Sequence, residues 1–255
     1  MFRTYEVPGV FDELDPNQPV LRYLNLVKFF DLVETRSLYF ADPITLNDER
    51  EGEVGLYNHQ FRPRVYADTP GLLDQLPKID QLAKRYALIS SWSISEKEDF
   101  LMSSTYGAPP PCIVVHSTWG ALQNSLLGDI PVYGEPVRYT DTDNKWTPEN
   151  TLFHWHMQKR ERFQGERELR LVIAAPGHTL QNSDRQPMGQ KVEIDIGTLL
   201  KSVSVGVTFC DPPLPMRSSP TSTSKAFRCQ SMKFLSLNRF TESLCSITWH
   251  KTLHM

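Results

Sequence analysis

Hydrophobic and polar positions in the first 210 residues switch repeatedly between a period of two, typical of strands, and helical spacing. Strands are predicted over residues 20–24, 37–40, 87–93, 112–116, 136–140, 169–174, 192–196 and 203–209. Helices are predicted after the cap residue Asn25, between 70 and 85 with an interruption at Pro77, after Thr118, and over 152–163. Many short strands with irregular helices between them indicate an α+β fold of mixed, mostly antiparallel sheets with peripheral helices.

Composition changes near residue 210. The last glycine is Gly206, and residues 211–255 are rich in Ser, Thr and Pro, with six Lys/Arg against two Asp/Glu. We therefore predict a single α+β domain over 1–210 and a basic C-terminal tail over 211–255. The tail fits a poorly ordered end, a basic segment that meets an anionic partner, or altered coding sequence such as a shifted reading frame.

The overall composition narrows the class of protein. With 40% hydrophobic and 22% charged residues, the 255-residue chain is globular, and its net charge of −3 argues against nucleic-acid binding through bulk positive charge. No apolar run is long enough to cross a membrane, the first residues lack a signal-peptide pattern, and the four cysteines show no metal spacing. We expect a soluble, reduced, cytoplasmic protein without a membrane partner.

Several catalytic signatures are missing from the sequence. It contains no phosphate-binding loop, no G-x-G-x-x-G, no G-x-S-x-G and no H-E-x-x-H motif. These absences argue against phosphate-loop kinases, Rossmann dehydrogenases, α/β-hydrolases and zinc proteases.

The densest polar cluster precedes and enters the predicted strand 169–174. Glu166, Glu168 and Arg170 alternate, so they are expected to share one strand face. The cluster fits a solvated edge with a Glu–Arg pair of little energetic value. It also fits a carboxylate beside a cleft, able to bind a ribose hydroxyl and stabilise positive charge on a sugar carbon.

Two further strands carry candidate residues. Ser91 and Ser93 share a face opposite Trp92, which suits either a polar cleft or a solvent-facing strand. Arg22 shares a face with the apolar residues of strand 20–24 and is therefore predicted to be half-buried. A half-buried arginine needs an anionic partner, either a protein carboxylate or a ligand phosphate.

An acidic loop and a basic segment complete the candidates. The loop contains Asn47, Asp48 and Glu51, and it could hold a divalent ion or simply be solvated. Lys159 and Arg160 form part of a basic segment near Glu166, which could meet a pyrophosphate or nucleic-acid backbone or be an ordinary solvated helix face.

An ordered set of short motifs resembles a known family. The motifs are Leu21-Arg22-Tyr23-Leu24, Ser37-Leu38-Tyr39-Phe40, Pro43-x-x-x-Asn47-Asp48-x-x-Glu51-Gly52, Ser91-Trp92-Ser93, Met102-x-x-x-Tyr106-Gly107 and Phe163-x-x-Glu166-x-Glu168-x-Arg170. Together they resemble the bacterial domain-of-unknown-function family 2971 over residues 18–206. The chain departs from the family at Ser103, where a tryptophan is usual, and it shows no resemblance beyond about Val205.

The layout of these motifs also resembles ADP-ribosyltransferases, including DNA-modifying toxins of bacterial (phage) defence systems, some of which have a split sheet. The resemblance implies NAD as substrate, a nucleic-acid, protein or water acceptor, and no metal. It implies Glu168 and Glu166 as the catalytic residues. The substrate contacts it implies are Arg22, Tyr23, Tyr39, Phe40, Ser91, Ser93 and Arg170.

Two alternatives belong to other functional classes. One is a metal-dependent nuclease that uses Asp48, Glu51 and Glu168. The other is a non-catalytic sensor or scaffold of a defence or regulatory system, in which Glu166, Glu168 and Arg170 form a closed ion-pair network. An open cleft that Glu168 shares with Arg22 and Ser93 favours the enzyme, and a sealed Glu168 favours the scaffold.

Overall fold

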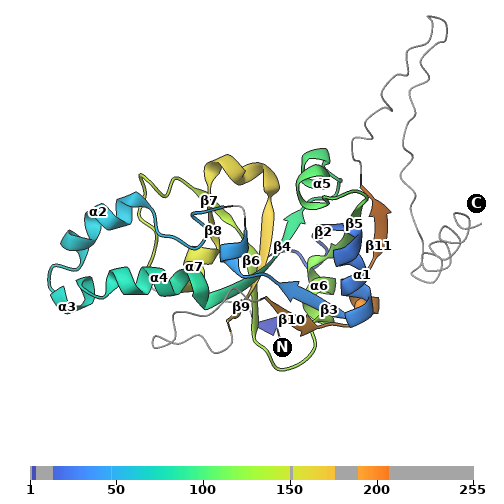
Figure 1. Ribbon diagram of the computed structural model, residues 1–255, viewed down its shortest axis with the longest axis horizontal. Coiled ribbons are helices and arrows are strands. Elements are labelled where there is room, and N and C mark those ends of the chain that lie inside the picture. The colour runs from blue at the N-terminus through green and yellow to red at the C-terminus, as the bar shows by residue number, and fades with distance from the viewer. Residues whose placement is uncertain (1, 4–13, 47, 150–151, 176–188, 207–255) are drawn as a thin grey trace, which may run out of the picture.

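A seven-stranded sheet forms the centre of the protein (Figure 1). The computed structural model describes residues 2–3, 14–46, 48–149, 152–175 and 189–206. The strand order is β1 (Phe2–Arg3), β6 (Val132–Pro136), β9 (Glu168–Ala174), β4 (Ala87–Ile94), β2 (Pro19–Asn25), β5 (Cys112–Thr118) and β11 (Ser202–Val205). All neighbours in this sheet are antiparallel except β1 and β6.

Two small strand pairs and several short helices surround the sheet. β3 (Ser37–Phe40) pairs with β10 (Gln190–Glu193) in antiparallel fashion, and β7 (Arg138–Thr140) pairs with β8 (Gln158–Arg160) in parallel. The helices are α1 (Leu26–Thr35), η1 (Pro43–Thr45), α2 (Leu56–Val65), α3 (Pro70–Leu73), α4 (Leu76–Tyr86), α5 (Phe100–Tyr106), α6 (Trp119–Ser125), α7 (Leu152–His156), η2 (Glu161–Glu166) and α8 (Ile196–Leu199). This arrangement confirms the predicted α+β fold with mostly antiparallel strands. None of the described helices combines the length and apolar content that a membrane span requires.

The larger hydrophobic core lies on one face of the sheet. Alternate residues of the central strands, such as Val20 of β2, Trp92 of β4 and Leu169 of β9, point into it. Residues of α1, α6, α8 and the β3–β10 pair complete this core. We call this side of the sheet the core face.

The opposite side of the sheet, here called the polar face, has apolar clusters at its two ends and a polar strip between them. One apolar cluster joins Leu21 and Tyr23 of β2 to β5 and α5, and the other joins β4 and β9 to α7. Between them lie Ser93 of β4 and its neighbours Glu168 and Arg170 on β9. At the end of the molecule away from β11, helices α2, α3 and α4 lie together (Figure 1).

Most predicted elements are present, and the helix over 152–163 is the main error. Only Leu152–His156 is helical; the chain then forms β8, which pairs with β7, followed by η2. Helix α2 was not predicted, because it lacks a regular apolar stripe and contains Pro63. The predicted tail over 211–255 and residues 207–210 lie outside the described residues.

Candidate functional site

The pairing of the central strands gathers the acids and the serines on the polar face. β4 is the middle strand of the sheet, and its pairing with β9 places Ser93 opposite Glu168 and Ser91 opposite Arg170. Directly opposed residues share a face, so these four side chains lie together as the sequence predicted. Glu166, Glu168 and Arg170 were expected to share one strand face, but Glu166 is not in the strand. β9 begins at Glu168, and Glu166 belongs to η2.

A buried ion-pair network holds Glu168. Its two carboxylate oxygens accept hydrogen bonds from Nε of Arg170 at 2.6 Å and from Nη2 at 3.0 Å. Arg170 is 1% exposed and Glu168 is 5% exposed, so the predicted solvated edge is wrong: β9 is an interior strand and the pair is buried. Burial alone would raise the pKa of Glu168, but the charge and hydrogen bonds of Arg170, aided by Lys159 and Ser91, lower it to about 2. Glu168 is therefore ionised at neutral pH.

The acidic loop supplies the second partner of Arg170. Glu51 binds both terminal nitrogens of Arg170, and Nη1 also donates to the carbonyl of His156 at 2.6 Å. Gly52 makes this approach feasible, because its φ is +70° and a Cβ there would lie 2.6 Å from the ring of His156. Burial lowers the pKa of His156 to about 4, so the ring is neutral and does not repel the nearby Arg170. The Glu51-Gly52 pair of the motif thus positions a carboxylate beneath Arg170.

Lys159 and Tyr106 connect Glu166 to the same network. Lys159 Nζ lies 2.5 Å from Glu166 Oε2 and 3.3 Å from Glu168 Oε2. The Tyr106 hydroxyl donates to Glu166 Oε1 at 2.9 Å, and Ser93 Oγ donates to the Glu166 carbonyl at 2.9 Å. Burial and the neighbouring Glu166 raise the pKa of Tyr106, which keeps the phenol protonated.

Solvent reaches this network at Ser91. Every other residue of β4 is buried or half-buried, whereas Ser91 is exposed although it lies in the middle of the sheet. Ser91 is one of the groups that lower the pKa of Glu168, and Tyr106, whose hydroxyl donates to Glu166, is also exposed. The polar face is therefore exposed to solvent at Ser91 and Tyr106, beside the two acids.

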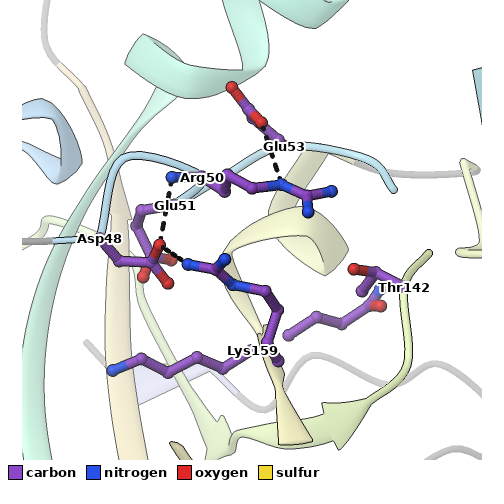
Figure 2. Close-up of a pocket in the computed structure, with 8 residues that line it drawn as sticks. Asp48, Arg50, Glu51, Glu53, Thr142 and Lys159 are labelled. Carbon is purple, nitrogen blue, oxygen red and sulfur yellow. Dashed lines mark hydrogen bonds and ion pairs between the residues drawn. The ribbon is translucent and has the colours of Figure 1, made fainter. Parts of the chain in front are cut away.

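A polar pocket adjoins the network (Figure 2). It is lined by the loop residues Asp48, Arg50, Glu51 and Glu53, by Thr142, and by Gln158, Lys159 and Arg160 of β8. In Figure 2 the loop lies along one side of the pocket and Lys159 along the other. Its charges are mutually paired, because Arg160 binds Asp48 and Arg50 binds Asp143 at 2.7 Å. The predicted basic segment is thus a set of ion pairs in the pocket wall, not a solvated helix face.

Three predicted substrate contacts lie on the core face, away from the acids. Arg22 pairs with Val115 on β5 and stacks on the Trp92 ring, both of which belong to the main core. Phe40 is fully buried in that core, while Tyr39 is 46% exposed on β3. The single cleft expected to join Glu168, Ser93 and Arg22 is therefore not formed. Leu21, and not Arg22, lies opposite Ser93, and adjacent residues of a strand point to opposite faces of the sheet. Tyr23, also predicted to contact substrate, does lie on the polar face, where its hydroxyl accepts the backbone N–H of Asp99.

Each of the three acids proposed for a nuclease already binds a basic side chain. Asp48 is bound to Arg160, and Glu51 and Glu168 share Arg170. Within the described ranges, no three His, Cys, Asp or Glu side chains are grouped closely enough to hold a metal ion. Asn47 lies outside the described residues.

Sequence reasoning did not assign site roles to Tyr106 or Tyr139, and it placed Lys159 in a basic segment without predicting its bonds to Glu166 and Glu168. Tyr139 accepts the backbone N–H of Glu168 at 2.7 Å through its hydroxyl oxygen. These residues come from three separate segments; Tyr106 had a signal in the Met102-x-x-x-Tyr106-Gly107 motif and Lys159 in the basic segment, whereas Tyr139 had none.

Comparison of the chain with protein-family models, with curated proteins and with solved structures found no match. The resemblance to family 2971 and to ADP-ribosyltransferases stays a prediction.

Proposed function

We propose that the chain transfers ADP-ribose from NAD, with Glu168 and Glu166 as the acids that act on the substrate and the acceptor. The observation that carries this proposal is the exposed Ser91 in the middle of the sheet, opposite Arg170 and beside the buried, ionised Glu168. Buried charge clusters beside a solvent opening are frequent at functional sites. Motifs that are far apart in the sequence, around Glu51, Ser91, Tyr106 and Glu168, also meet there.

The side chains on the polar face suit part of an NAD molecule. Carboxylates and serine hydroxyls can bond the hydroxyls of the nicotinamide ribose. Arg22, which was expected to bind the pyrophosphate, is on the other face and takes no part. Lys159 and Arg160 line the adjoining pocket, and either one would have to exchange its present carboxylate partner for the pyrophosphate to take that role.

The two acids would have different roles in the transfer reaction. Glu168 would hold the ribose 2′-hydroxyl and offset the positive charge that develops on the sugar carbon as its bond to nicotinamide breaks. Glu166 would take the proton of the acceptor that bonds to that carbon, while nicotinamide leaves with the bonding electron pair. Tyr106 and Lys159 hold one oxygen each of Glu166 and would set its orientation.

The test is incubation with labelled NAD and separate DNA, RNA and protein acceptors. The wild type is expected to release nicotinamide and label one acceptor class, and Glu168→Gln is expected to abolish both. Glu193→Gln is the control, because Glu193 is an exposed glutamate on β10, which pairs with β3 and lies away from the acids of the polar face. Ser91→Ala removes an exposed hydroxyl beside Glu168 and should slow turnover on the order of tenfold without unfolding the protein. A folded wild type that neither binds nor cleaves NAD with any acceptor refutes the proposal.

A non-catalytic sensor or scaffold is the second candidate, and the closed ion-pair network favours it. All four carboxylate oxygens of Glu166 and Glu168 already have partners. In that case the network would only hold the loop around Glu51 on the sheet, as buried pairs can do at little net gain in stability. Calorimetry separates the candidates: a scaffold gives no heat of NAD binding, and Glu168→Gln then changes stability alone.

A further inference from the structure

Arg22 lies on the core face with little to compensate its charge. It is half-buried on β2, between the main sheet and β3. Its Nη2 donates to the backbone carbonyl of Tyr39 at 3.2 Å, and its guanidinium carbon lies 5.5 Å from the centre of the Trp92 ring. Among the residues that the structure describes, no carboxylate pairs with it.

Other buried arginines of the chain show the arrangement that Arg22 lacks. Arg62, 4% exposed, binds Asp80 through both terminal nitrogens at 2.6 Å and Glu149 through Nε at 2.9 Å. Arg170 likewise has two carboxylates. A buried cation without such a partner is costly, and burial accordingly lowers the pKa of Arg22 to about 10.

A second unused donor lies beside Arg22. Trp92 is 2% exposed, and its indole Nε1 has no hydrogen-bond partner within the described ranges. Buried indole N–H groups normally find an acceptor. The exposed ring of Tyr39, whose carbonyl Arg22 already binds, adds a flat surface next to the cluster.

We infer that Arg22 anchors a binding site for an oxyanion, a phosphate or carboxylate group of a small ligand, between β2, β3 and β4 on the core face. An arginine presents a planar fork of N–H donors that matches such groups, and an oxyanion would neutralise the charge that the described residues leave uncompensated. This site is separate from the acids on the polar face, and the inference goes beyond the proposed transferase without resting on it.

The test is thermal unfolding of the full chain in inorganic phosphate and, separately, in acetate, at matched ionic strength and without NAD. One of the two anions is expected to stabilise the wild type, with the folded-to-unfolded ratio rising about tenfold for each tenfold increase above the dissociation constant. Phosphate as the stabilising anion identifies a phosphate ligand, and acetate identifies a carboxylate ligand. Arg22→Gln should lose this effect, and Arg22→Lys should retain part of it. Arg162→Gln is the matched control, because Arg162 is an exposed arginine that also lies over an aromatic ring, that of Phe163.

Two results overturn the inference. One is an equal anion effect, or none, in the wild type and Arg22→Gln. The other appears without any added anion: if Arg22→Gln is then much less stable than the wild type, a group elsewhere in the chain already neutralises Arg22. The inference predicts that this variant is at least as stable as the wild type under those conditions.

Discussion

Replacing Glu168 by Gln should destabilise the protein by an amount that depends on pH. In the folded protein the pKa of Glu168 is lowered from 4.5 to about 2, chiefly because Arg170 outweighs the cost of burial. That fall corresponds to about 3 kcal/mol of folding free energy when the group is ionised in both states. The variant should therefore be about 3 kcal/mol less stable at neutral pH, in line with the loss of a buried ion pair.

The direction of the pH effect follows from the lowered pKa. The contribution of Glu168 is fully present above about pH 4.5 and is lost as the pH falls toward 2, because the folded state resists protonation that the unfolded chain accepts. The difference in unfolding free energy between wild type and Glu168→Gln should therefore shrink over that interval. Urea unfolding at a series of pH values measures it, and Glu193→Gln, an exposed glutamate on β10, is the control. A difference below about 1 kcal/mol at neutral pH, or one that does not change with pH, would refute the reasoning.

Three further substitutions test other parts of the structure. Burial raises the pKa of Glu135 from 4.5 to about 7, so its ionisation costs stability as the pH rises; Glu135→Gln should gain up to about 3 kcal/mol above pH 7 and little below pH 4.5, measured by urea unfolding. Gly52→Ala should lose about 3 kcal/mol in the same assay, from a left-handed backbone and a clash with His156, whereas Gly71→Ala meets no atom and should fold normally. Asn25→Ala removes the side-chain cap of α1 and should lower the unfolding free energy by about 1 kcal/mol.

Local patterns were enough to predict most strands and the face on which each candidate lies within its own strand. Strict alternation correctly placed Arg22 with Val20 and Leu24, and Ser91 with Ser93 opposite Trp92. Local patterns could not reveal that the side chains of Arg22 and Glu168 lie on opposite faces of the sheet. That relation depends on the register between β2, β4 and β9, which no single strand encodes.

The burial of the Glu168–Arg170 ion pair was also beyond local reasoning. Glu166, Glu168 and Arg170 were consistent with a solvated edge because their partners come from distant segments. Glu51 and Tyr106 reach the network from a loop and from α5, and Lys159 reaches it from β8. The predicted helix over 152–163 failed for the same reason: tertiary pairing of Lys159 and Arg160 with carboxylates favours the extended strand over the local helical pattern.

Backbone chemical shifts during a titration with NAD test the central claim most directly, because they report which face of the sheet the ligand meets. We expect the amide signals of Ser91, Ser93 and Glu168 to move in a saturable way, while those of α6 on the core face stay in place. A titration that leaves Ser91 and Glu168 unchanged, or that moves only the core-face signals, would contradict it.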